Sequence, residues 1–380
     1  MKIDDKTSHN SPSIRFPEFT GEWKEFSLGE IGDSFIGLTY KPTDTVPSGG
    51  IIVFRSSNIQ DGCIDYKDIV RVNKKVRENL ITKNGDLLIC ARNGSSRLIG
   101  KNALLHRTDA NQTFGAFMMV FRSDKNHFVH HLLNTKRYTS QVAENLGARI
   151  NQITSSDLSS FRFFFPKDDK EMTRIASLFD LLDGRIAVQN RLIDRLQSLM
   201  KGIRHRIINE AKGKIVCLCE VSDIYQPQTI SSADLTETGY PVYGANGIIG
   251  HYTSYNHEAE QVCITCRGNT CGGVNYTKSK SWITGNAMVV NVDRYQNIVS
   301  KRYLYHYLSN CDFNSIISGS GQPQIVRAPL AKFKIILPTV MQQYKIAHCL
   351  DVIQNKINVN SNILNLLIRQ KQYLLRKMFI

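Results

Sequence analysis

The chain has 380 residues, 42% of them hydrophobic, and its 48 Lys and Arg outnumber its 33 Asp and Glu, which gives a formal net charge of +15. This length predicts two or more domains, and the positive excess favours a polyanion such as nucleic acid as partner. No run approaches the roughly 18 apolar residues of a membrane span, and Met1 to Pro12 lack the apolar core of a signal peptide, so we expect a cytoplasmic protein.

Residues 1–166 predict a globular α+β unit. Short apolar runs at 87–92, 116–120 and 161–166 are typical of strands, and Gly, Asn and Ser mark the turns between them. A helical pattern covers 128–146. It contains the pair His130-His131, which we interpret as surface or packing residues rather than ligands.

Residues 167–212 predict one long helix. From Ile175 to Ile207 the apolar positions recur in alternating steps of four and three, with Gln189 as the polar member of the series. This heptad seam is typical of a helix that packs along a partner helix rather than on a broad core. The stretch from Glu171 to Asn209 would be roughly 60 Å long at about 1.5 Å per residue.

The second half of the chain repeats the first. Adding 171 to the seam positions gives a second seam from Ile346 to Met378, in which Asn360 takes the place of Gln189. Upstream of it, the strand-like runs at 262–267, 287–291 and 333–338 match those of the first unit. The predicted order is therefore a unit at 1–166, a helix at 167–212, a second unit at 213–338 and a second helix at 339–380.

Two equal helices from one chain predict an antiparallel coiled coil about an approximate two-fold axis. Gln189 and Asn360 lie near the middle of their helices, so the two amides are expected to meet and to fix the helix register. The alternative is that each is a tolerated polar seam residue. The helices would hold the two globular units apart, and each unit would then contact its own short site on a duplex.

Motifs for catalysis are missing from the sequence. It contains no Gly-x-x-x-x-Gly-Lys-Ser/Thr phosphate loop, and the glycines from Gly244 to Gly250 have the wrong spacing for a dinucleotide fingerprint. Cys266 or Cys271 beside His251 or His257 is a weak candidate for a nucleophile pair. We expect a binding protein without a catalytic site.

A cysteine cluster invites a zinc interpretation that the repeat argues against. Cys263-x-x-Cys266 aligns with Leu88 and Ala91 of the first unit, so these cysteines stand where small hydrophobic residues stand in the other copy. A tetrahedral site also lacks a convincing fourth ligand. We therefore expect no metal.

The doubled plan of unit, helix, unit and helix resembles the specificity subunit of type I restriction–modification systems. The segments Arg15–Lys24, Leu28–Ile31, Gly319–Ile325 and Phe333–Pro338 look like that family. The resemblance implies that each unit is a target recognition domain for half of a bipartite, asymmetric DNA sequence. It implies that the helices form a spacer and a scaffold for two modification subunits. These methyltransferase subunits would carry S-adenosylmethionine.

The resemblance further implies that restriction subunits, which are endonucleases and translocases that use ATP and Mg²⁺, can join the complex. It implies no cofactor and no catalytic residue in this chain. Two alternatives stay open at this point. One is a nucleic-acid-modifying enzyme that acts alone, and the other is a coiled-coil adaptor that does not bind DNA.

Residues that contact bases should be Arg, Lys, Asn, Gln, Ser or Thr on glycine-rich loops. In the first unit the candidates are Arg92, Asn93, Ser95, Ser96, Arg97, Lys101, Arg149, Asn151 and Gln152, with Lys101 suited to a phosphate. In the second unit they are Arg267, Asn269, Thr270, Gln322, Gln324 and Arg327. The alternative is that these are solvated turn residues, or that Gln322 and Gln324 brace the long helix.

Overall fold

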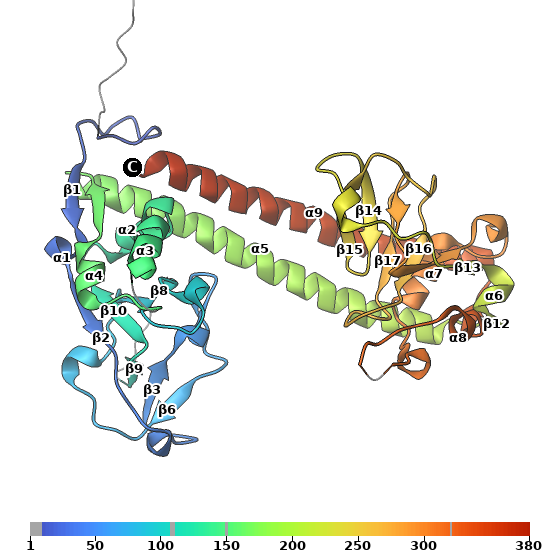
Figure 1. The fold of residues 1–380 in the computed structure, drawn as a ribbon, viewed down its shortest axis with the longest axis horizontal. Coiled ribbons are helices and arrows are strands. Elements are labelled where there is room, and N and C mark those ends of the chain that lie inside the picture. Colours follow the sequence, from blue (N-terminus) through green and yellow to red (C-terminus); the bar gives the residue numbers. More distant parts are fainter. Residues whose placement is uncertain (1–9, 107–110, 149–150, 320) are drawn as a thin grey trace, which may run out of the picture. The chain divides into compact units, whose positions relative to one another are not determined.

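The computed structural model describes residues 10–106, 111–148, 151–319 and 321–380, except for the side chains of 147 and 148 (Figure 1). The chain divides into two compact units, Met1–Val188 with Leu364–Ile380 and Gln189–Ile363. The long helices are α5 (Asp169–Glu210) and α9 (Val340–Met378). Each of them has one part in the first unit and the other part in the second unit. In the described part of the chain, no helix is both long and apolar enough to cross a membrane.

The first unit is a mixed α+β fold around a four-stranded antiparallel sheet with strand order β2-β10-β7-β8. A second sheet, β6-β3-β9, and the pairs β1-β11 and β4-β5 surround it. The strands are β1 (Lys24–Ser27), β2 (Asp33–Ile36), β3 (Ile51–Phe54), β4 (Ile59–Gln60), β5 (Cys63–Ile64), β6 (Val70–Val72), β7 (Leu87–Cys90), β8 (Asn102–Leu104), β9 (Gln112–Phe114), β10 (Met118–Arg122) and β11 (Arg162–Phe165). The short helices are α1 (Leu28–Ile31), α2 (Asn126–Leu132), α3 (Lys136–Ala148) and α4 (Ser155–Ser160).

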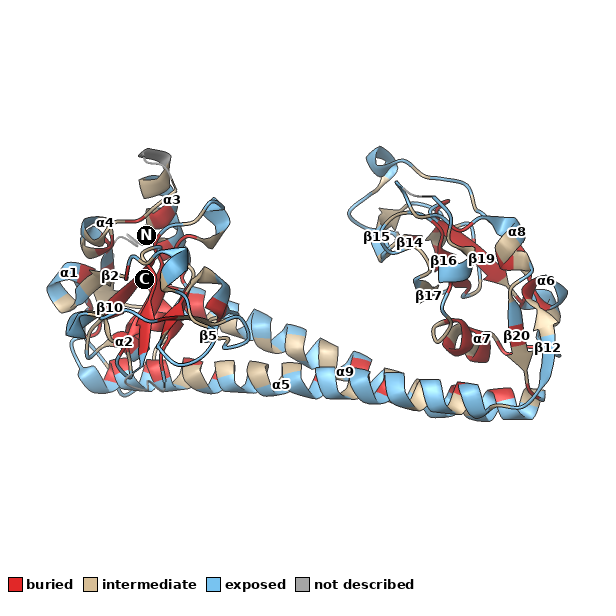
Figure 2. Cartoon of the chain, turned by 90° about the horizontal axis from the view of Figure 1, so that it is seen from below, coloured by how far each residue is buried: buried red, intermediate tan, exposed pale blue. Residues whose placement is uncertain are grey.

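Strand β7 is buried on both faces and divides the core of the first unit. Leu87 and Ile89 belong to one cluster, together with Trp23 on the N-terminal segment and Phe179 on α5. Leu88 and Cys90 face the other cluster, which includes Phe54, Phe114 and Met118. Alternate residues of a strand point to opposite faces, so one short strand serves both clusters. Figure 2 shows that buried residues of the first unit are concentrated in its central strands.

The helix predicted over 128–146 is divided in the structure, which corrects that prediction. α2 ends at Leu132 and α3 begins at Lys136. The side chain of Asn134 donates to the carbonyl of His130, and the hydroxyl of Thr135 donates to the carbonyl of Leu132. These polar side chains bond the carbonyls that a continuing helix would use, and so they end α2.

The second unit repeats the four-stranded sheet with strand order β13-β19-β16-β17. The other sheets are β15-β14-β18 and the pair β12-β20. The strands are β12 (Lys214–Cys217), β13 (Asp223–Tyr225), β14 (Tyr240–Gly244), β15 (Gly247–Tyr252), β16 (Val262–Thr265), β17 (Val274–Tyr276), β18 (Trp282–Ile283), β19 (Ala287–Asn291) and β20 (Lys334–Leu337). The short helices are α6 (Leu218–Val221), α7 (Lys301–Leu308) and α8 (Arg327–Ala331).

The internal repeat and the α+β class are confirmed element by element. β1 pairs with β11 as β12 pairs with β20, and α1 follows β1 as α6 follows β12. Even the turn chemistry recurs, because a glutamate at the third helical position accepts a hydrogen bond from the backbone N–H of Ser27 in one copy and of Cys217 in the other.

The long helices pair antiparallel within each unit. In the second unit Met200 of α5 packs with Leu350 and Ile357 of α9. The side-chain amide of Gln189 donates to Asn360 Oδ1 at 2.7 Å and to the Asn360 carbonyl at 3.0 Å. In the first unit Asp183 of α5 bonds Lys371 of α9. Both predicted long helices are confirmed, while the register role of the amide pair stays a prediction.

Candidate nucleic-acid interface

The loop that follows β7 carries most of the candidates in the first unit. Beyond the buried Ala91 the chain reaches the surface, and the Arg92 guanidinium lies over the Phe117 ring, 5.5 Å from the ring centre. The side chain of Asn93 donates to Ser56 Oγ at 3.1 Å and accepts from the Ser95 backbone N–H at 3.0 Å. An asparagine that bonds two residues onward forms a tight local turn. Hydrogen bonds within the loop and to Ser56 therefore fix its backbone, while the side chains of Arg92, Ser95, Ser96 and Arg97 stay exposed.

The second candidate cluster lies against this loop. Arg92 and Gln152 form an isolated antiparallel β-bridge, and the Ile153 N–H donates to the Ala91 carbonyl at 2.7 Å. Asn151, with a φ of 39°, donates from its side chain to the Gly94 carbonyl at 3.3 Å. We call residues 91–97 with 151–153 the first loop pair. Arg149 lies outside the described residues.

Two further candidates sit at the end of the same loop. Arg97 lies in a short 3-10 turn, Ser96–Leu98, and is exposed. Lys101 is half-buried, and its carbonyl accepts from the Cys90 N–H at 2.8 Å, so its backbone is tied to the core strand. The first loop pair and Lys101 therefore share the support of β7.

The second unit builds the same frame from other residues. Arg267 and Gln324 form an antiparallel β-bridge, and the Ile325 N–H donates to the Cys266 carbonyl at 3.0 Å. The Gly268 N–H donates to the Pro323 carbonyl at 3.0 Å. We call residues 266–270 with 322–325 the second loop pair. Its five candidate side chains are exposed, namely those of Arg267, Asn269, Thr270, Gln322 and Gln324.

The remaining candidate of the second unit has a structural contact. The Arg327 guanidinium donates through Nε to the Ile224 carbonyl at 2.7 Å, which holds the start of α8 against β13. The alternative for Gln322 and Gln324 was that they brace the long helix. Within the described ranges 10–106, 111–148, 151–319 and 321–380, neither side-chain amide is hydrogen-bonded to a long helix. Both side chains are exposed.

Cys263 and Cys266, the Cys-x-x-Cys pair of the second unit, are buried core residues. Cys263 packs with Tyr243 and Ile283, and Cys266 packs in the neighbouring cluster. Burial raises the pKa of the Cys263 thiol to about 12, so this thiol is not poised to ionise. His257 is hydrogen-bonded to Tyr225 Oη at 2.9 Å and to Asn256 Oδ1 at 2.6 Å rather than to a thiol.

A groove beside the first loop pair contains residues that sequence reasoning missed. It has a volume of about 860 Å³ and is lined by Tyr40, Arg55, Ser56, Asp68 and Phe117, among others. The Phe117 ring is 59% exposed, although it stands between two buried strands. An exposed aromatic ring with polar groups around it suits contact with a base or sugar. The signal in the sequence was Gly115-Ala116-Phe117, a turn with one large apolar residue.

Comparison with known proteins identifies the family of the chain. A family model described as the type I restriction modification DNA specificity domain matches residues 20–198 and again 211–369. The chain belongs to this family. The two matches fall on the two copies of the repeat.

Individual proteins are also similar to this chain, some in sequence and one in fold. The chain is 31% identical over 148 residues to the type I restriction enzyme EcoprrI specificity subunit of Escherichia coli, covering 38% of this chain and 36% of that protein. It is 27% identical over 188 residues to the EcoKI specificity subunit of E. coli K12, covering 47% and 40%. The matches therefore span well under half the length of these curated relatives. The S subunit of a type I system from M. genitalium superposes with a TM-score of 0.69 at 16% identity, covering 97% of this chain and 99% of that one, which shows the shared fold.

Proposed function

We propose that this chain is the DNA sequence-specificity subunit of a type I restriction–modification complex and reads a bipartite, asymmetric target. The supporting observation is one backbone frame built twice, with an arginine and a glutamine at the bridge in both copies and different residues beside them. Arg92 and Gln152 are bridged in the first loop pair as Arg267 and Gln324 are in the second. Arg suits the acceptors of guanine, and Gln and Asn suit adenine, with about 1–3 kcal/mol of discrimination for each bidentate contact.

The proposal assigns residues 1–166 and 213–338 as target recognition domains and 167–212 and 339–380 as spacer helices. The net charge of +15 supplies the attraction to phosphates that a duplex-binding protein needs. Arg97, Lys101 and Asn269 are assigned to DNA contact on the edges of the two loop pairs.

The partners in this proposal are two methyltransferase subunits and the restriction subunits. Both long helices present apolar side chains that the chain itself leaves exposed. In the first unit Leu181 and Leu366 are 69% and 63% exposed, and in the second unit Leu199, Val352 and Val359 are 51%, 55% and 56% exposed. Exposed apolar surface of this kind marks contact sites for other proteins. S-adenosylmethionine, ATP and Mg²⁺ are assigned to those partners, and this chain is assigned no catalytic step.

The test is a protection footprint of the complex reconstituted with its modification subunits. We expect two protected patches with a fixed gap between them. Exchange of residues 20–165 for another recognition domain should change only one patch. A single unbroken patch, a change in both patches, or methyl transfer by the isolated chain would contradict the proposal.

A point variant sharpens the test. Arg92→Ala should weaken discrimination at one base pair of one half-site. Arg206→Ala is the matched control, because Arg206 is an exposed arginine on α5 that pairs with Glu210. Equal losses for the two variants would show that the effect is general charge and not base recognition.

A further inference from the structure

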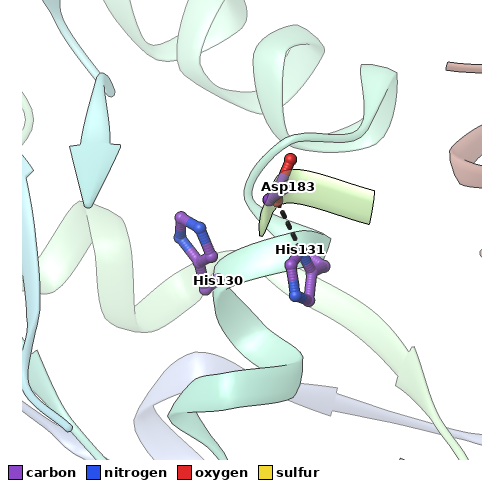
Figure 3. Close-up of side chains that lie close together, drawn as sticks. All are labelled: His130, His131 and Asp183. Atoms are coloured by element: carbon purple, nitrogen blue, oxygen red, sulfur yellow. Dashed lines mark ion pairs between the residues drawn. The ribbon is translucent and has the colours of Figure 1, made fainter. Parts of the chain in front are cut away.

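Two histidines and an aspartate converge in the first unit, at the contact between α2 and α5. His130 and His131 are adjacent on α2, and Asp183 faces them from α5 (Figure 3). A ligand atom from each of the three side chains lies within 4.8 Å of the other two. Both imidazoles are buried, at 7% and 0% exposure.

Each imidazole is oriented through one ring nitrogen. His131 Nε2 lies 2.9 Å from Asp180 Oδ1, and His130 Nδ1 lies 3.0 Å from Asn102 Oδ1. His131 Nδ1 is fully buried without a hydrogen-bond partner and lies 3.9 Å from Asp183 Oδ2. A histidine fixed by a carboxylate or amide through one nitrogen, with the other nitrogen directed at a cluster of ligand atoms, is the arrangement of metal-binding histidines.

We propose that His130, His131 and Asp183 form a zinc-binding site that joins α2 to α5 in the first unit. Two imidazole nitrogens and one carboxylate oxygen suit Zn²⁺ at bond lengths of about 2.0–2.2 Å, with water as the fourth ligand. Nitrogen ligands disfavour Mg²⁺ and Ca²⁺. The ligand atoms lie within 4.8 Å of one another and must close by up to about 1.4 Å to reach the roughly 3.4 Å spacing of tetrahedral zinc ligands. The proposal goes beyond the proposed DNA-specificity function and does not depend on it.

The second unit is an internal control. His306 Nε2 lies 2.7 Å from Asp351 Oδ1, as His131 does from Asp180, and His306 Nδ1 is also buried without a partner. The His–Asp pair therefore recurs as a structural contact between the short helix and the long one. However, Tyr305 stands where His130 stands, and Gln354 stands where Asp183 stands. The two additional ligands occur in the first unit only, which predicts one site per chain.

Lys371 on α9 is the charge that opposes a cation here. Its ammonium donates to Asp183 Oδ1, which leaves Oδ2 for a metal. Asp180 on the other side of His131 offsets this positive charge. Removal of the ammonium should therefore strengthen metal binding, whereas removal of a ligand should weaken it.

The experiment uses the full chain, stripped with a chelator and titrated with Zn²⁺ against a chromophoric competitor. We expect one equivalent bound by the parent chain and a thermal shift of the unfolding transition on binding, because zinc binds only the folded site. Co²⁺ should give the intense visible absorption of a tetrahedral ion without a thiolate charge-transfer band. The absence of a thiolate band excludes metal binding to the chain's nine cysteines.

Four variants complete the test. His130→Tyr and Asp183→Asn should each lose at least tenfold in zinc affinity. His306→Gln, the control in the second unit, should leave the affinity unchanged, and Lys371→Met should raise it. Because Lys371→Met acts in the opposite direction to the ligand variants, a general loss of folding cannot mimic the expected set. A parent chain that binds no zinc, thiolate bands with Co²⁺, or equal affinity for the parent chain and Asp183→Asn would overturn the proposal.

Discussion

The carboxylate of Glu171 offers the sharpest stability prediction for the first unit. Arg15 Nε and Nη2 donate to its two oxygens at 2.7 Å each, and the Trp23 indole N–H lies 3.4 Å from Oε1. The Glu171 side chain is 1% exposed and that of Arg15 is 15% exposed. This contact explains the N-terminal motif, because it places Arg15 and Trp23 on the start of α5.

Glu171→Ala should destabilise the first unit by about 3 kcal/mol. Removing one partner of a buried ion pair costs about 3–5 kcal/mol, because the other charge is left without compensation. The lower end applies here, since Arg15 keeps hydrogen bonds to the Gly21 and Thr20 carbonyls at 2.6 and 3.2 Å. Glu18→Ala is the matched control. It breaks an ion pair with Arg174 whose side chains are 41% and 58% exposed, and should change stability by less than about 1 kcal/mol.

Urea unfolding followed by tryptophan fluorescence measures this difference. The chain has two tryptophans, and Trp282→Phe leaves Trp23 as the reporter of the first unit. The double variant Arg15→Leu with Glu171→Leu should recover most of the lost stability, because no charge is then left buried. Equal midpoints for Glu171→Ala and Glu18→Ala, or a double variant as unstable as Glu171→Ala, would refute the reasoning.

We make three further predictions, which concern Gln189, His306 and Arg92. Gln189→Leu should cost about 1 kcal/mol by leaving Asn360 Oδ1 without its donor, and a second change of Asn360 to Leu should restore stability in urea melts; no recovery would contradict the pairing. Burial is the main cause that lowers the pKa of His306 to about 4. The unfolded chain, with a histidine pKa of about 6.5, therefore binds more protons than the folded chain as the pH falls, and the second unit should lose about 1.6 kcal/mol of stability between pH 6.5 and 5. Trp282 fluorescence in urea measures this loss, and His306→Gln should flatten the profile. Arg92→Ala should lower affinity for its own half-site by about 1–3 kcal/mol while the other half-site is read as before, measured by competition with substituted duplexes.

The long helices were predictable because their signal is local and redundant. The heptad seam repeats over many turns, so the observed helices α5 (Asp169–Glu210) and α9 (Val340–Met378) lie within a few residues of the predicted bounds. The short helices were harder, because a side chain such as Asn134 decides where α2 ends. That residue is compatible with a helix in the sequence, and its bond to the His130 carbonyl is visible only in the structure.

The smaller sheets could not be predicted, since their pairings join distant segments. β3 pairs in parallel with β9, and β14 pairs in parallel with β18. Parallel pairing requires a long connection, and nothing in either short run identifies its partner. The groove at Phe117 was missed for the same reason, because its other walls come from residues near 40 and 55. The loop pairs were found because turn residues follow a buried strand in both copies.

In the proposed function, the repeated frame would let the chain change its DNA target without refolding. In each loop pair the position is held by main-chain atoms, through the Ile153 N–H to the Ala91 carbonyl and the Ile325 N–H to the Cys266 carbonyl. Main-chain bonds do not depend on which side chain each residue carries. Arg92 and Arg267 are exposed beyond these bonds, so their replacement leaves the frame intact. The proposed function thereby separates specificity from stability, because the buried strands β7 and β16 support the frame and the exposed side chains are assigned to DNA contact.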